Sequence, residues 1–193
     1  MLQMNGMNIL KRTSRLFYEK SNLKIAILCT TIFAAYIALV MTRQAIGFEV
    51  ANSSVKSLGM TFGFQKSDII SFFQLRTEKM MSAYIGFNLI WDTIFALIYG
   101  VMYSVWLSLL LKASAKEISF INLIPFVQVL FDWSENFSLA YLAQQYLSNE
   151  TISQTIAKLS SGFVMIKWIS SGLTYFMIIL AIGFLITGRF KKK

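Results

Sequence analysis

The chain has 193 residues, of which 56% are hydrophobic and 14% are charged. A soluble domain carries about 25% charged residues, so this composition excludes an ordinary soluble domain and predicts one all-α membrane domain, residues 1–193. The formal net charge is +9. The basic residues gather at the ends of apolar segments, where they set topology, and we therefore expect no nucleic-acid partner.

Histidine is absent and there is a single cysteine, Cys29. Without histidine the chain cannot form a His-based catalytic triad, a His-ligated haem or a zinc site that contains histidine. One cysteine cannot form a disulfide within the chain, and we expect Cys29 to be a packing residue. The expected cofactors and metal ions are therefore none.

Residues 1–24 form a polar, basic segment that we expect to stay in the cytoplasm. A short amphipathic helix that anchors the chain at the membrane interface is a further interpretation of this segment. The apolar residues that would form its hydrophobic side are Ile9, Leu10, Leu16 and Phe17.

The first predicted membrane span covers residues 25–42, because a helix needs about 17–25 apolar residues to cross the bilayer. No A-x-A cleavage site follows it, so we interpret it as an anchor rather than a signal peptide. The long loop 43–81 follows on the outer side and contains the sequence LGMTFGF. Its part 66–81 predicts a short amphipathic helix in the outer interface, capped by Ser67 or Asp68. The alternative is a lid over a site that opens to that side.

The second predicted span covers residues 82–111 and carries a polar stripe. Asn88, Asp92, Tyr99 and Tyr103 are separated by four, seven and four residues. These offsets place the four side chains on one face of an α-helix.

The third predicted span, 118–147, carries the heptad FDWSENF. Within five residues this heptad contains Asp132, Glu135 and Asn136. Ionisable groups at membrane depth are costly and usually face a bundle interior or a wet cavity, so this heptad marks a functional site.

The fourth predicted span, 161–188, carries Lys167 beside Trp168. We expect Trp168, like the other aromatic residues near the charged groups, to face lipid or to fill the core.

The distribution of basic residues predicts the orientation. The N-terminal segment, the connector between spans two and three and the C-terminal tail carry eleven Lys and Arg, whereas the other two loops carry six. By the positive-inside rule both termini are cytoplasmic. The predicted fold is an integral membrane four-helix bundle with a short helix in the outer loop between spans one and two.

The charged residues of three spans fall at similar depths in this bundle. At about 1.5 Å per residue, Asp92, Glu135 and Lys167 lie about 13–17 Å from the outer ends of their helices, and Asp132 lies one turn deeper. Because an unpaired charge there costs several kcal/mol, we expect these groups to pair. The candidate binding residues are Asp92, Asp132, Glu135, Asn136, Lys167, Tyr99, Tyr103 and Asn88.

Three acids against one lysine would leave this cluster with an excess negative charge if all four groups were ionised. Either one or two acids stay protonated, or a further cation enters the site. That cation could be a metal ion, a proton in transit or a substrate amine.

Short motifs of this chain resemble those of an uncharacterised group of bacterial four-span membrane proteins. The motifs are LGMTFGF in the outer loop, DTIFALIYG in span two, FDWSEN in span three and KW in span four. The resemblance implies a four-span fold, the importance of these positions and a place in the bacterial inner membrane, and it implies no reaction. The bundle also loosely resembles sterol-isomerase-like proteins, which bind amines through intramembrane acids, but the enzymes among them use histidine.

Three functions stay open from the sequence. In the first, which we favour, the acids bind or move a cation, a proton or an amphiphilic amine, with Lys167 as internal counter-ion. In the second, the chain is an enzyme acting on a lipid, with the carboxylates as acid and base or as Mg²⁺ ligands. In the third, it is an accessory subunit whose polar network only fixes packing. The expected partners are the lipid bilayer and a small cationic or amphiphilic ligand, in a homo-oligomer or a larger membrane complex.

Overall fold

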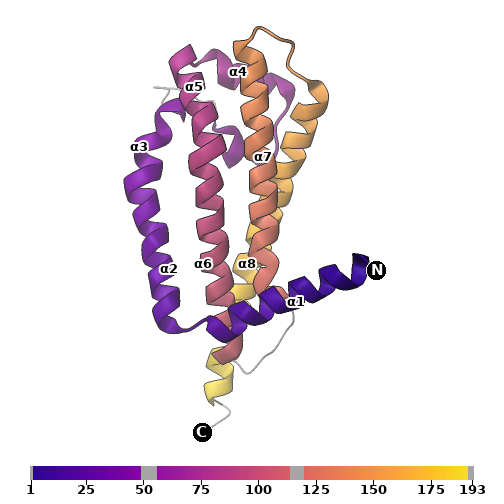
Figure 1. Cartoon of the computed structure of the whole chain (residues 1–193). Coiled ribbons are helices and arrows are strands. Elements are labelled where there is room, and N and C mark those ends of the chain that lie inside the picture. Colours follow the sequence, from indigo (N-terminus) through magenta and orange to yellow (C-terminus); the bar gives the residue numbers. More distant parts are fainter. Residues whose placement is uncertain (1, 49–55, 114–119, 191–193) are drawn as a thin grey trace. The chain divides into compact units, whose positions relative to one another are not determined.

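A computed structural model describes residues 2–48, 56–113 and 120–190. Within these ranges the chain is mostly helical and contains no strand, which confirms the predicted all-α class (Figure 1). The chain divides into two compact units. Unit 1 comprises Met1–Phe33, Ile98–Gln128 and Ile169–Lys193, and unit 2 comprises Ala34–Leu97 and Val129–Trp168.

Three helical segments are long and apolar enough to cross a membrane, consistent with a multi-pass membrane protein. They are Leu23–Phe48 with 26 residues, Glu78–Ala113 with 36 residues and Gln154–Thr187 with 34 residues. They correspond to the predicted first, second and fourth spans.

The first two of these segments are built from shorter helical elements. The first consists of α2 (Leu23–Tyr36), a π-helical turn (Ile37–Met41), α3 (Thr42–Gln44) and a 3₁₀ turn (Ala45–Phe48). The second consists of α5 (Glu78–Gly86), a π-helical turn (Phe87–Asp92) and α6 (Thr93–Ala113). A π turn closes its hydrogen bond one residue further along than an α turn, so each insertion changes which residues share a face.

Two further long helices are α7 (Ile124–Leu147) and α8 (Gln154–Phe190). α7 follows a 3₁₀ turn at Ile121–Leu123 and so begins later than the predicted start of span three at 118, a position outside the described residues. With 24 residues α7 has the length of a span, but its polar residues keep it out of the three most apolar segments. α8 begins before the predicted start of span four at 161.

Some of the residues that set the predicted orientation are not described. The connector residues 114–119 and the tail residues 191–193 lie outside the described part of the chain, and so do loop residues 49–55.

The loop segment predicted as one helix over 66–81 contains two helices, α4 (Lys66–Gln74) and α5. The break occurs because Thr77 caps α5, its side chain accepting a hydrogen bond of 3.3 Å from the Met80 backbone N–H. The cap of α4 is Gln65 rather than Ser67 or Asp68. Asp68 completes a capping box by accepting a hydrogen bond of 2.7 Å from the Gln65 backbone N–H.

α4 packs into the core of unit 2 through its apolar side. Ile69, Phe72 and Phe73 of this helix are completely buried. Phe72 makes ring contacts with Phe73 and Tyr84, with centroids 5.9 and 5.2 Å apart. The buried residues of this core are Leu58, Ile69, Phe72, Phe73, Met81, Tyr84, Leu139, Leu142, Ala143, Ile152 and Ala157.

Arg76 closes the end of α4. Its Nε donates to the Gly47 carbonyl at 2.6 Å, its Nη1 donates to the Phe72 carbonyl, and its guanidinium carbon lies 3.2 Å from the centroid of the Phe72 ring. Burial lowers the pKa of Arg76 to about 10. The side chain therefore stays charged at neutral pH and ties α4 to the end of the first apolar segment.

The Phe72→Ala substitution tests this core. We expect it to lower the free energy of unfolding by about 3–5 kcal/mol, because removing a buried ring leaves a cavity. The measurement is thermal or denaturant unfolding of the full chain in detergent. The matched control is Phe62→Ala, since the Phe62 side chain is 62% exposed. Equal effects of the two substitutions would contradict the packing described here.

Candidate functional site

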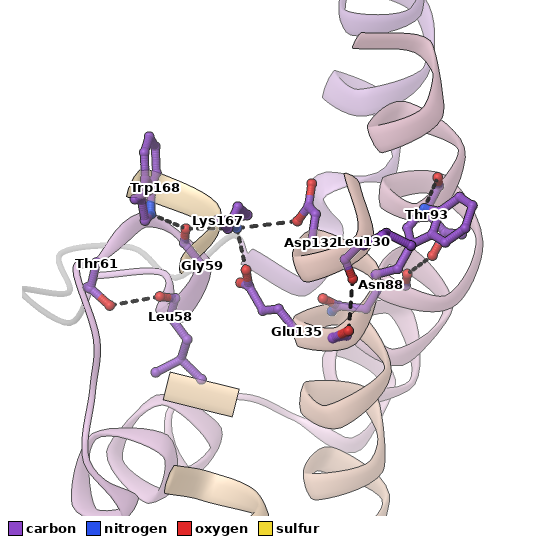
Figure 2. Close-up of polar contacts among 12 residues, drawn as sticks. Leu58, Gly59, Thr61, Asn88, Thr93, Leu130, Asp132, Glu135, Lys167 and Trp168 are labelled. Carbon is purple, nitrogen blue, oxygen red and sulfur yellow. Dashed lines mark hydrogen bonds and ion pairs between the residues drawn. The ribbon is translucent and has the colours of Figure 1, made fainter. Parts of the chain in front are cut away.

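Lys167 of α8 forms two buried ion pairs with α7 in unit 2. Its Nζ lies 3.3 Å from Asp132 Oδ1 and also pairs with Glu135 Oε2 (Figure 2). The two acids are three residues apart on α7, which places both carboxylates on one face of the helix. Glu135 is only 2% exposed. The structure thus brings together the three charged residues of predicted spans three and four.

The loop that carries LGMTFGF supplies the third partner of Lys167. The Gly59 carbonyl accepts a hydrogen bond of 3.3 Å from Lys167 Nζ and one of 3.2 Å from Trp168 Nε1 (Figure 2). Further along this loop, the Phe64 backbone N–H donates to Ser161 Oγ at 2.9 Å. The loop segment is therefore fastened to α8 at two places.

Glycine is required at position 59 by this close approach. A Cβ atom there would lie 2.5 Å from Glu135 Oε1 and 3.6 Å from Lys167 Nζ. Gly63 has a positive φ of 91°, a conformation that L side chains rarely adopt. The two glycines of the motif thus allow the loop backbone to reach the charged groups.

Asp92 lies at the end of the π turn, in the same unit. Its carboxylate interacts through charge with Asp132 and Lys167. Asn136 is almost fully buried. Asp92 therefore joins the charged group of α7 and α8, and we call Asp92, Asp132, Glu135 and Lys167 the charged cluster.

Asn88 forms hydrogen bonds at the π turn with both its side chain and its backbone. Its side-chain amide donates to the Tyr84 carbonyl at 2.8 Å, and its own carbonyl accepts a hydrogen bond of 2.8 Å from Thr93 Oγ1. The Thr93 carbonyl in turn accepts from Trp133 Nε1 at 2.9 Å. These side chains satisfy backbone groups where the regular α-helical ladder is interrupted.

Tyr99 and Tyr103, which the sequence places on one stripe with Asp92, belong to unit 1. The Tyr103 and Tyr175 hydroxyl oxygens are 3.2 Å apart, and the ring centroids of Tyr99 and Tyr103 are 6.1 Å apart. The predicted stripe assumes an uninterrupted α-helix. In the structure Asn88 and Asp92 lie in a π turn, and the tyrosines lie in α6, which follows it.

Two residues beside Lys167, Gly59 and Trp168, were not predicted from the sequence as part of the site. Gly59 carries no side chain, and its role is that of a backbone acceptor 108 residues away from Lys167. Trp168 was expected to face lipid or fill the core, but its indole N–H donates to Gly59. The available signals were the two glycines in LGMTFGF and a tryptophan directly beside an intramembrane lysine.

Lysine has three N–H donors, and Lys167 has three acceptors, two carboxylates and one carbonyl. Among the residues that the structure describes, no three His, Cys, Asp or Glu side chains form a group that could hold a metal ion. No known protein family matches the chain, and neither does any curated protein or solved structure. What the cluster presents chemically is three carboxylates grouped around one ammonium group.

Gly59→Ala is expected to destabilise the protein by about 1–3 kcal/mol, because the added methyl group displaces Glu135 from Lys167. Thermal unfolding of the full chain measures the effect. Gly86→Ala is the control, since a Cβ at that helical position meets nothing within 4 Å. It should stabilise by about 0.5–1 kcal/mol. In a Glu135→Ala background the penalty at position 59 should largely disappear, and a penalty that persists would contradict the assigned contact.

Lys167→Met is expected to cost about 3–5 kcal/mol of stability, because two buried carboxylates lose their shared cation. The exposed Lys158 of the same helix provides the control Lys158→Met, for which we expect little change. Adding Asp132→Asn and Glu135→Gln to Lys167→Met should restore most of the stability, since no buried charge pair is then broken. A triple variant less stable than Lys167→Met alone would contradict this account.

Proposed function

We propose that this chain is a four-span membrane protein that binds or moves a small cation at the charged cluster. The cation is a proton or the ammonium group of an amphiphilic amine. One observation supports the proposal above all. Two carboxylates and a backbone carbonyl contact Lys167 Nζ, and a bound ammonium ligand would need the same kinds of contact.

In the proposed topology α7 is the third of four membrane spans, because its 24 residues are enough to cross a bilayer. Both termini would be cytoplasmic, and α4 would lie between spans one and two on the outer side. If the resemblance to bacterial four-span proteins holds, the location is the bacterial inner membrane. Because four spans are few for a transporter, we also expect a homo-oligomer or a larger membrane complex.

The groups around Lys167 Nζ form an ammonium site. Two carboxylates supply charge, the Gly59 carbonyl supplies a neutral acceptor, and the Trp168 ring centroid lies 5.8 Å from Nζ. Carboxylates, carbonyls and tryptophan faces are the groups by which proteins recognise organic ammonium ions. Lys167 is thus a tethered ammonium ion within such a site.

The charge balance favours a second cation. Asp92, Asp132 and Glu135 face one lysine, and burial makes an excess of ionised carboxylates costly. Because the three donors of Lys167 are already used, an incoming cation either neutralises Asp92 or takes the place of Lys167. The flexible four-carbon stem of lysine permits such an exchange.

A direct test uses dansylcadaverine, a fluorescent primary amine, with the full chain in lipid nanodiscs. We expect saturable binding that Glu135→Gln weakens roughly tenfold or more, because one charge-assisted hydrogen bond is worth about 1.5–3 kcal/mol. The exposed Glu150 supplies the control Glu150→Gln, which should bind as the unmodified chain does.

Proton movement is measured in parallel on vesicles loaded with the pH dye pyranine. Asp92→Asn and Glu135→Gln should slow proton entry relative to Glu150→Gln. If amine binding and proton entry are both absent in the unmodified chain, or both unaffected by the two cluster substitutions in correctly folded protein, the proposal is wrong.

A further inference from the structure

We propose that α1 (Leu2–Lys20) and the basic residues around it form a binding surface for anionic phospholipid headgroups. This surface belongs to unit 1 and does not depend on the charged cluster. In Figure 1 α1 runs crosswise to α2 rather than alongside it, which is the arrangement of a helix that lies in a membrane surface.

One side of α1 is fixed to the protein by buried polar contacts. Ser14 Oγ donates to Asn122 Oδ1 at 2.7 Å, and Asn122 Nδ2 donates to the Ser14 carbonyl at 2.8 Å and to Ser108 Oγ at 2.9 Å. The rings of Phe17 and Phe126 lie beside each other, with centroids 5.7 Å apart. Because these contacts set the rotation of α1, they also set which residues face outward.

The outward residues divide into an apolar and a basic flank. Ile9 and Leu16 are seven residues apart, share one face, and are 62% and 54% exposed. Lys11 and Arg15 are exposed and lie away from that face, whereas Arg12, three residues after Ile9 and four before Leu16, lies at the border between the two flanks. A helix with an apolar flank beside a basic flank fits the boundary between acyl chains and headgroups.

The charge around α1 is strongly unbalanced. The exposed basic residues of this region are Lys11, Arg12, Arg15, Lys20, Lys24 and Lys112. Glu19 is the one acidic residue within the described part of unit 1, and it pairs with Arg15 at 2.6 Å. Lys112 Nζ donates to the Glu19 backbone carbonyl at 3.4 Å, which brings its charge to the end of α1.

An anionic lipid fits this surface better than a soluble polyanion does. A nucleic acid would satisfy the basic residues but would leave Ile9 and Leu16 in water. A phospholipid supplies both a negative headgroup and an apolar chain, and the apolar segment Leu23–Phe48 begins just after α1. Each Lys or Arg near an anionic membrane surface contributes about 1 kcal/mol to binding.

The first experiment measures binding of fluorescent phosphatidylglycerol and of fluorescent phosphatidylcholine to the purified full chain in neutral detergent. The variant is Lys11→Gln, Arg12→Gln and Lys20→Gln together, which avoids Arg15 because Glu19 already pairs with it. We expect its affinity for phosphatidylglycerol to fall roughly a hundredfold, at roughly fivefold for each of the three charges removed, with no change for phosphatidylcholine.

The matched control removes three exposed lysines of unit 2 by Lys56→Gln, Lys79→Gln and Lys158→Gln. It changes the net charge equally and should keep the affinity for phosphatidylglycerol. Equal losses in the two triple variants would overturn the proposal, because the effect would then be one of net charge. A soluble RNA oligonucleotide that competes fully for the same residues would also overturn it.

A second measurement tests the apolar flank in a Cys29→Ala background. A nitroxide label at Ile9→Cys should collide mainly with oxygen in vesicles of phosphatidylcholine and phosphatidylglycerol, whereas a label at Lys11→Cys, on the other side of the helix, should collide with a water-soluble nickel reagent. A label at position 9 that is as open to the nickel reagent as the label at position 11 would show that α1 does not lie in the membrane surface.

Discussion

Burial of two carboxylates beside one lysine is the constraint on which the arrangement of unit 2 depends. Asp132 and Glu135 are among the most costly groups to place in an apolar environment, and Lys167 is their shared cation. With two carboxylates bound, Lys167 still has one N–H donor to satisfy, and the Gly59 carbonyl accepts from it. The position of the loop that carries LGMTFGF therefore follows from the requirements of the ion pair, and glycine at position 59 follows from the approach of this loop to Glu135.

The π turn Phe87–Asp92 is the second structural feature that determines the geometry of the site. A regular helix would leave Asn88 and Asp92 on one polar face, one turn apart. In the structure the two side chains have different partners, since the Asn88 amide donates to the Tyr84 carbonyl while Asp92 interacts through charge with Asp132 and Lys167. π turns are frequent at functional sites because the interrupted ladder re-aims side chains and frees backbone groups. Here the side chains of Asn88 and Thr93 donate hydrogen bonds to two backbone carbonyls at the turn.

The parts of the fold that local composition determines were predictable. Apolar length placed three of the predicted spans, and the acids of FDWSENF were correctly singled out as costly groups that need a partner. What could not be predicted depends on contacts between distant residues. Gly59 meets Lys167 across 108 positions, and no local pattern encodes a backbone acceptor. The break between α4 and α5 and the π turn were missed because periodicity was extended through residues where capping by Thr77 and packing decide the backbone.

The contacts also distinguish the two sequence interpretations of the outer loop. Movement of α4 as a lid would expose Ile69, Phe72 and Phe73, which are buried in the core of unit 2, so these contacts favour a fixed helix. The segment that touches the charged cluster is the LGMTFGF motif, and Lys167 is one of several residues that hold it. If Lys167 leaves its carboxylates to admit an ammonium ion, Gly59 keeps the hydrogen bond from Trp168, and Phe64 keeps its bond to Ser161. Departure of Lys167 alone would therefore leave the loop segment held to α8 by two hydrogen bonds.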